Sequence, residues 1–266
     1  MSIAFSVDLE PNKDGSFDGV DEAMDWYNTV IPSGTVYVTY RIATERPDIV
    51  ADLGSNHEIG VHVHPQDFGH ETDNLAMLAR ERQRELIRKT RMTVADAVST
   101  DPDNLTAFRA GRHKASPDTL AVLAALGFEV DASVNVRYRE HMPAAVTDRR
   151  GPFEHDSGLV ELPTTYGEPP LCSRVGVRAG PGGNVTATAS ELRSDRRLCS
   201  GLRALSWLLE TTPGVVSMYM HPYDATTYHE DLENSGPPFR DRLKILLDET
   251  ERPFLTATDV RDAVRQ

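Results

Sequence analysis

The sequence predicts an α/β fold, a distorted (β/α) barrel of about seven parallel strands in which residues 1–266 form a single domain. Short apolar runs alternate with longer helical segments along the chain, which is typical of parallel strands covered by helices. Several of these runs end in a carboxylate, an arginine or a histidine, and active sites of barrels are built at the carboxyl ends of the strands. No internal repeat or low-complexity segment divides the chain.

The expected strands are short and mostly apolar, as buried parallel strands are. The first is Ile3–Val7, and the second, Thr35–Thr39, is a β-branched run. The remaining strands are expected at Glu58–His64, Ala107–Ala110, Phe128–Val134, Leu159–Leu162, Val215–Met220 and Phe254–Thr256.

Helices are expected between these strands. Asn74–Val98 carries apolar residues at helical spacing among many Arg and Glu residues. Another helix is expected to start at Ser116 as the N-cap, with Pro117 in the first turn, and to end before Gly127. Further helices are expected at Val20–Val30, Pro47–Leu53, Arg197–Leu209 and Phe239–Glu249, and Pro163–Gly183 is expected to be an insertion that lines the site.

The composition argues against several classes of protein. A hydrophobic share of 39% with 26% charged residues describes a globular chain with a substantial core. The formal charge of −13 argues against nucleic-acid binding, which requires clustered Lys and Arg. No apolar run approaches the ~20 residues needed to span a bilayer, and Met1–Glu10 does not read as a signal peptide, so we expect a cytoplasmic protein without membrane insertion. Cys172 and Cys199 lack CxxC spacing, which predicts two reduced thiols.

The basic residues are mostly arginine, because only four of the 28 are lysine. An acidic, lysine-poor surface is typical of a salt-rich cytosol, although a GC-rich genome explains the arginine excess equally well. Salt adaptation predicts that Tm rises with KCl, because the Debye length falls from ~10 Å at 0.1 M to ~3 Å at 1 M and self-repulsion is screened. A Tm that stays flat from low to molar salt would contradict salt adaptation.

Two carboxylates end the first strand. In Ser6-Val7-Asp8-Leu9-Glu10, the side chains of Asp8 and Glu10 are two residues apart and therefore share one face of the strand. They stand where a barrel builds its active site. For this segment alone, a solvated strand end is the competing interpretation.

Two histidines end the third strand, in EIGVHVHP. His62 and His64 share one face, so their imidazoles can converge on one ion. With Glu10 they form a set of two imidazoles and one carboxylate, which leaves coordination positions open for water and substrate. The other histidines are interpreted as surface or loop residues, and the first two to reconsider are His70 and His113; the rest are His57, His141, His155 and His229.

An arginine ends the fourth strand, in FRAGR. A buried arginine needs a carboxylate partner because an unpaired buried cation is costly, and Asp8 is the candidate for Arg109. Gly111 would let the backbone come close to a substrate oxygen, and we place Arg112 beside it as a second substrate-binding residue.

The strand Val215–Met220 delivers His221 to its carboxyl end and continues as Pro-Tyr-Asp. For this segment alone, a catalytic histidine and a core histidine are equally good interpretations. We expect Tyr223 to contact the substrate if the site interpretation holds.

Taken in order, these segments resemble the polysaccharide deacetylase superfamily, the NodB-homology domain of carbohydrate esterase family 4. SVDLE is similar to the first motif of the family, EIGVHVHP to the second, FRAGRHKASPDTLAVLAALGFEVDASV to the arginine motif with its following helix and strand, and MYMHP to the last. The resemblance covers nearly the whole chain and implies a barrel of the glycoside hydrolase/deacetylase type. It also implies that Asp8 is the general base, that Arg109 orients this base, and that His221 is the general acid.

The resemblance further implies one divalent metal ion, with zinc preferred and cobalt, manganese or nickel possible. The family spaces its two ligand histidines four residues apart, which would place a glutamine after His62, so His64 or the loop residue His70 must be the second ligand. Leu9 stands where the family has a second aspartate, which passes the ligand role to Glu10. These departures indicate a divergent branch.

The arginine motif departs from the family as well. Arg109-Ala110-Gly111-Arg112 replaces Arg-x-Pro-Tyr, which leaves the backbone donor to the oxyanion open. The role of Asp131, in the EVDAS strand, does not transfer from the family.

The resemblance implies a metal-dependent hydrolase that removes an acyl group, expected to be acetyl, from an N- or O-acylated sugar or sugar conjugate. For a cytoplasmic enzyme the expected partner is a small sugar conjugate or glycan precursor, bound by the loops Glu140–His155 and Pro163–Gly183. One alternative is another metal-dependent barrel amidohydrolase or phosphoesterase, in which HxH usually stands on the first strand. The other is a non-catalytic sugar-binding protein on the same fold, which the presence of Asp8 and His221 disfavours.

Overall fold

The computed structural model describes residues 1–169, 184–195, 200–227 and 232–266, and its centre is an eight-stranded sheet. The strands of this sheet are β1 (Ser2–Leu9), β2 (Thr35–Thr39), β3 (Glu58–Val63), β4 (Ala107–Ala110), β5 (Val130–Asp131), β6 (Phe153–Glu154), β7 (Val160–Glu161) and β10 (Val215–Met220). Seven of them are parallel, in the order β10-β1-β2-β3-β4-β5-β7, and β6 pairs antiparallel to β7 at one edge. The predicted fold class is therefore confirmed.

The sheet curls into a half-barrel, and the chain that follows β7 bridges its open side. Thr164 N donates to Val134 O (2.9 Å), and Thr165 N donates to Ser217 O on β10 (3.1 Å). Ser217 N in turn donates to Thr165 Oγ1 (2.9 Å). A two-stranded sheet, β8 (Tyr166–Gly167) with β9 (Val185–Thr186), continues from this bridge. The carboxyl ends of the parallel strands therefore surround one opening of the half-barrel, which we call its mouth.

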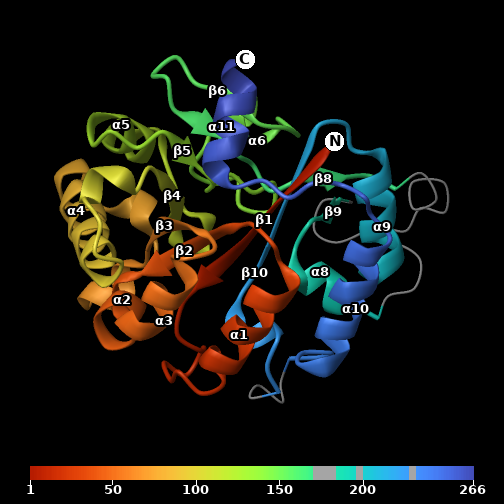
Figure 1. Ribbon diagram of the computed structural model, residues 1–266. Helices are drawn as coiled ribbons and strands as arrows, with labels where there is room; N and C mark the ends of the chain where they lie inside the picture. Colours follow the sequence, from red (N-terminus) through yellow and green to blue (C-terminus); the bar gives the residue numbers. More distant parts are fainter. Residues whose placement is uncertain (170–183, 196–199, 228–231) are drawn as a thin grey trace.

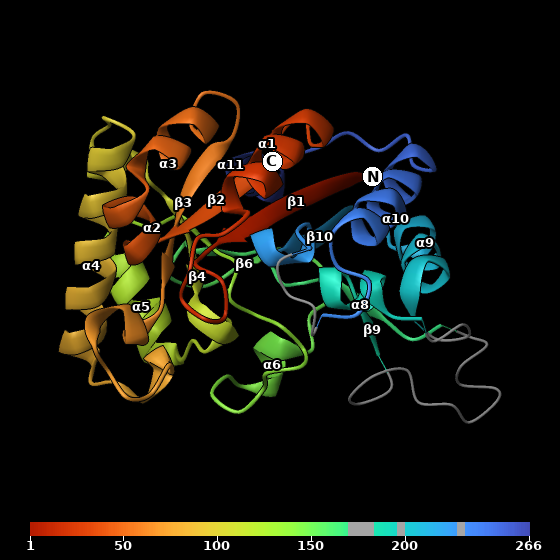
Figure 2. The ribbon, with the colours of Figure 1, turned by 90° about the horizontal axis from the view of Figure 1, so that it is seen from below.

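Helices cover the outer face of the sheet (Figures 1 and 2). The helices of the described part of the chain are α1 (Val20–Val30), α2 (Tyr40–Glu45), α3 (Pro47–Leu53), α4 (Arg80–Ala97), α5 (Pro117–Ala125), α6 (Ala144–Thr147), α8 (Ala189–Arg193), α9 (Gly201–Thr211), α10 (Pro237–Asp248) and α11 (Ala257–Arg265), of which α11 packs against the inner face instead. The predicted N-cap of α5 is confirmed, because Ser116 forms a reciprocal capping box with Thr119. Among the described residues, no helix has both the length and the apolar character to cross a membrane.

The hydrophobic core has two parts. The larger part lies between the sheet and the surrounding helices. The smaller part fills the inside of the half-barrel, where Ala257 and Val260 of α11 pack with Tyr37 and Val130. Figure 1 shows α11 beside the start of β1, so this helix covers the amino-terminal end of the strands. The opposite, carboxyl end is left for the site.

Several predicted elements differ in extent. The segment Asn74–Val98 begins with a 3₁₀ turn, and α4 starts only at Arg80. The expected strand Phe128–Val134 shortens to β5, and Phe254–Thr256 contributes only a single bridge from Phe254 to Ile3. Residues 170–183 of the expected insertion, the first residues of the expected helix Arg197–Leu209, and both cysteines lie outside the described residues.

Two carboxyl groups are buried side by side on neighbouring strands. Asp131 on β5 pairs in register with Glu161 on β7, and both side chains are inaccessible to solvent. Glu161 Oε1 accepts from Val134 N (3.1 Å), and Ser133 N donates to Asp131 Oδ1 (3.1 Å). Burial raises the pKa of Glu161 to about 8, and burial together with Glu161 raises the pKa of Asp131 well above its usual range.

We predict that Glu161→Gln makes the free energy of unfolding less dependent on pH. In the unfolded chain Glu161 loses its proton near its ordinary pKa of 4.5, whereas the folded protein keeps the proton up to about 8. The wild type therefore loses stability as pH rises through this window, at no more than about 1.4 kcal/mol per pH unit for this group. Glutamine keeps an oxygen for Val134 N and cannot ionise, so the variant should be more stable than the wild type at pH 8.

Urea unfolding at pH 5 and pH 8 measures this effect. Glu154→Gln, at an exposed position on β6, is the matched control and should leave the pH dependence unchanged. Equal pH dependence in Glu161→Gln and the wild type would contradict the prediction.

Candidate active site

The predicted site residues meet at the carboxyl end of three parallel strands. β1 delivers Asp8 and Glu10, β3 delivers His62 and His64, and β10 ends directly before His221. These side chains line one cavity of about 770 Å³, and Tyr223 lines it with them. The half-barrel thus brings residues from the two ends of the chain to one mouth, as the carboxyl ends of barrel strands do.

Asp8 and Arg109 form a buried ion pair in the floor of this mouth. The Arg109 guanidinium donates to Asp8 Oδ1, and Arg109 Nε donates to Ala132 O (3.0 Å). The guanidinium also lies over the rings of Tyr37 and Tyr219, 4.2 and 5.1 Å from their centroids. Burial favours the protonated form of Asp8, but Arg109, with smaller contributions from nearby histidines, holds the pKa of Asp8 below its ordinary value. Asp8 is therefore an ionised acceptor of fixed orientation.

Glu10, His62 and His64 form the one cluster of potential metal ligands found among the described residues. Glu10 Oε2 lies 2.9 Å from His64 Nε2 and 3.8 Å from His62 Nε2, and the two Nε2 atoms are 3.1 Å apart. Although burial opposes ionisation, the neighbouring imidazoles hold the pKa of Glu10 well below its usual range. All three donor atoms converge on one point.

The other nitrogen of each imidazole is held by an acceptor. His62 Nδ1 lies 2.9 Å from Arg109 O, and His64 Nδ1 lies 2.8 Å from Asp73 Oδ2. An acceptor at Nδ1 fixes the proton there and directs the Nε2 lone pair toward a metal. Two such lone pairs facing each other beside a carboxylate make a donor set suited to a divalent cation.

His221 lies beside this cluster in the same cavity. Its Nε2 lies 3.9 Å from Asp8 Oδ2 and 3.7 Å from Glu10 Oε1, and its ring stacks on Tyr223 with centroids 4.6 Å apart. Its Nδ1 lies 3.4 Å from Asp224 Oδ2, which also accepts from His221 N (2.8 Å). Burial favours the neutral ring, but Asp224 and then Glu10 outweigh burial and raise the pKa of His221 above its ordinary value of 6.5.

The residues expected on the substrate side lie in different places. Arg112 and Tyr223 line the cavity, and Arg112 Nε donates to Asp73 Oδ2 (2.5 Å). Gly111 packs under the metal-ligand cluster, since a Cβ atom at this position would lie 2.8 Å from His64 Nδ1. Its proximity to a substrate oxygen stays a prediction. His70 lies apart from the cluster and accepts from Arg82 Nε (3.0 Å).

The sequence interpretation missed three polar residues of the site. Asp73 holds His64, Asp224 holds His221, and His113 lines the cavity. Asp224 follows three residues after His221, a spacing that indicates a side chain folding back on a helix start. His57 lies in a loop, as expected, and His113 in a 3₁₀ turn, but neither is on the surface: both are buried, under Tyr27 and between Tyr138 and Tyr219 respectively.

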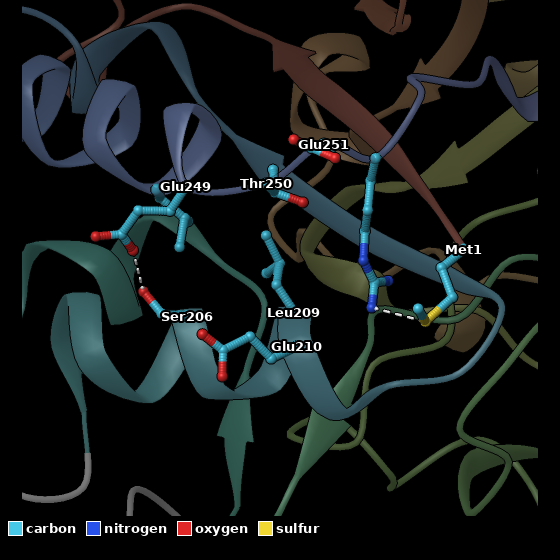
Figure 3. Close-up of a pocket in the computed structure, with 9 residues that line it drawn as sticks. Met1, Ser206, Leu209, Glu210, Glu249, Thr250 and Glu251 are labelled. Carbon is cyan, nitrogen blue, oxygen red and sulfur yellow. Dashed lines mark hydrogen bonds between the residues drawn. The ribbon is translucent and has the colours of Figure 1, made fainter.

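A second cavity, of about 470 Å³, lies at the amino-terminal end of the sheet beside Met1 (Figure 3). Its walls come from α9, the end of α10 and the segment that follows. In it Ser206 Oγ donates to Glu249 Oε2 (3.0 Å), and Arg252 Nη2 lies 3.3 Å from Met1 Sδ. Among the described residues that line this cavity there is no histidine.

Solved structures show the same architecture. A protein from Mycobacterium smegmatis, named as a predicted polysaccharide deacetylase, superposes with a TM-score of 0.61 at 15% identity over 99% of this chain and 91% of that one. The chain has the fold of the polysaccharide deacetylases. A family 4 acetyl xylan esterase from Clostridium thermocellum, solved with a cobalt ion, gives a TM-score of 0.54 at 13% identity over 98% of this chain and 90% of that one.

A further match to this fold is a family 4 pseudoenzyme from Bacillus anthracis, with a TM-score of 0.55 at 10% identity over 98% of this chain and 65% of that one. At these identities the likeness shows the fold. No family model matches the sequence, and no curated protein matches it either.

Proposed function

We propose that this protein is a metal-dependent hydrolase that removes an acyl group, in particular acetyl, from an N- or O-acylated sugar or sugar conjugate. The observation that carries the proposal is the convergence of three units in one cavity: the Asp8–Arg109 pair, the Glu10–His62–His64 cluster, and His221. Such a set supplies a base, a metal site and an acid around one point, which is what acyl-transfer to water requires.

Glu10, His62 and His64 would hold a divalent cation, with zinc favoured by the two imidazoles and cobalt, manganese or nickel compatible with them. When bound, such a cation would polarise the acyl carbonyl and lower the pKa of water, so that water could give up a proton near neutral pH. Asp8 takes the proton of the attacking water, and Arg109 keeps its carboxylate ionised and oriented. His221, held by Asp224, then protonates the leaving nitrogen or oxygen.

The lining of the cavity suits a small sugar conjugate. Its basic side chains are Lys13, Arg41, Arg112 and Lys114, of which the last three pair with Glu45, Asp73 and Glu140 respectively. Aromatic rings of Tyr138, Tyr219 and Tyr223 stand among them. Aromatic faces suit sugar rings, so a sugar conjugate or glycan precursor fits this lining.

The direct test is acetate release from a panel of N-acetylated sugars and sugar nucleotides, combined with metal analysis of the same preparation by inductively coupled plasma spectrometry. We expect one divalent metal per chain, and turnover of at least one monosaccharide conjugate. Fast turnover of long chitin oligomers alone would contradict the proposed substrate size.

We predict that His62→Ala and His64→Ala each remove the bound metal and the activity, while circular dichroism shows a folded protein. Loss of one of three ligands leaves too few donors to hold the ion. His70→Ala is the matched control, because His70 hydrogen-bonds Arg82 and should leave metal content unchanged. Full metal occupancy in His64→Ala together with loss in His70→Ala would contradict this ligand assignment.

A further inference from the structure

His113 places a buried nitrogen without a partner in the wall of the catalytic cavity. The residue lines the cavity, and only 7% of its surface is exposed. Its Nε2 has no hydrogen-bond partner among the described residues. A buried polar atom that stays unpaired destabilises the fold, so it requires an explanation.

The hydrogen bond at the other ring nitrogen determines the chemistry of Nε2. His113 Nδ1 lies 3.1 Å from Ser133 O, and a carbonyl oxygen can only accept, so Nδ1 carries the proton. In the neutral ring Nε2 is then a lone-pair acceptor. Burial and the nearby Arg109 cation lower the pKa of His113 to about 3, which keeps the ring neutral at any working pH.

The surroundings hold this ring in one orientation. The imidazole ring of His113 stacks on the ring of Tyr138, with centroids 5.7 Å apart. The centroid of the Tyr219 ring lies 4.8 Å from that of His113. Ser133 is itself fixed, because its hydroxyl donates to Asp131 Oδ1 at 2.5 Å and accepts from Ala110 N at 2.8 Å. The buried carboxyl Asp131 thus anchors the carbonyl group that sets the tautomer of His113.

The backbone is strained at the same place. Arg112 and His113 are consecutive non-glycine residues with φ of 53° and 56°, in the left-handed region. Such conformations are costly and persist mainly where function maintains them. Strain, a fixed tautomer and an unpaired acceptor therefore coincide at one residue of the cavity wall.

We propose that His113 Nε2 accepts a hydrogen bond from an N–H or O–H group of the bound substrate, and that it is a specificity-determining residue. This inference rests on the proposed deacylase function. Tyr219 lies against the rings of both His113 and His221, so the acceptor stands one ring away from the proposed acid. Two substrate groups could donate to His113 Nε2. One is the N–H of an N-acyl group, next to the scissile carbonyl, and the other is a neighbouring sugar hydroxyl.

An unpaired nitrogen alone does not make a site, and the chain offers its own comparison. His57 is also buried and has an unpaired Nδ1, but it packs against Tyr27 and does not line the cavity. His57→Phe is therefore the matched control for His113→Phe.

The experiment compares kcat/KM for paired N-acetyl and O-acetyl sugars in the wild type, His113→Phe and His57→Phe. Phenylalanine keeps the ring stacking and removes the acceptor, so the loss expected in His113→Phe is ~10- to 100-fold, mainly through KM. Loss confined to N-acetyl substrates identifies the amide N–H as the donor, and equal loss on both classes identifies a hydroxyl. His57→Phe should change kcat/KM less than threefold on either.

A second variant separates binding from folding. Phenylalanine also removes the donor to Ser133 O, whereas the amide of His113→Gln offers both a donor and an acceptor, so His113→Gln should recover part of the loss. A kcat/KM for His113→Phe equal to that of the wild type on every substrate would overturn the proposal, and so would equal losses in the folded Phe and Gln variants.

Calorimetric binding of the methyl glycoside of N-acetylglucosamine distinguishes the two proposals. If the wild type releases no acetate from any substrate, the deacylase function fails. A weaker Kd in His113→Phe than in His57→Phe would still support the acceptor role, and identical Kd values would refute that role independently of turnover.

Discussion

Replacing Asp8 by asparagine is expected to lower kcat by ~10²- to 10⁴-fold, the range that a general base contributes. The amide fills the same space but cannot take a proton from the attacking water. Because Asp8 lies next to the metal-ligand cluster rather than within it, metal content should stay near that of the wild type. The result separates loss of the base from loss of the metal.

The comparison variant is Asp67→Asn. Asp67 also lines the cavity, but its carboxylate accepts from Arg41 N instead of pairing with Arg109. Its replacement should change kcat far less. An Asp8→Asn enzyme with near-normal turnover would overturn the assignment of the base and the mechanism built on it.

Replacing His221 by alanine is expected to lower turnover of amide substrates by ~10²- to 10⁴-fold and that of activated aryl esters much less. An amine leaves only after protonation, whereas an aryl oxide departs unaided. The acid must start protonated, so activity of the wild type should fall on the alkaline side as His221 loses its proton. Since Asp224 and Glu10 raise the pKa of His221, this limb should lie above pH 6.5.

His141→Ala is the control for this variant, since His141 accepts from Asn74 outside the cavity. His141→Ala should lower turnover of neither the amide nor the aryl ester. Equal losses of amide and aryl-ester turnover in His221→Ala would remove this residue from the acid role.

The barrel and the approximate position of its site could be predicted from the sequence because strand ends are marked locally. Asp8, His62 and His221 each close an apolar run, and a parallel sheet places such ends at one mouth whatever the distance along the chain. The two-residue spacing of His62 and His64 similarly fixes their shared strand face. These features depend on neighbouring residues alone.

Contacts made by loops could not be predicted in the same way. Asp73 reaches His64 from a loop without a periodic pattern, and the burial of His113 depends on Tyr138 and Tyr219, far away in sequence. A lone histidine carries no local sign of what will cover it.

The most direct test of the central claim is a titration of the metal-stripped protein with cobalt or zinc, in which bound metal and acetate release are measured at every point. We predict that activity rises in proportion to occupancy and stops rising at one ion per chain, and that His64→Ala shows neither change. Full turnover by the stripped protein would contradict the account. So would saturation at one ion per chain without acetate release from any member of the substrate panel.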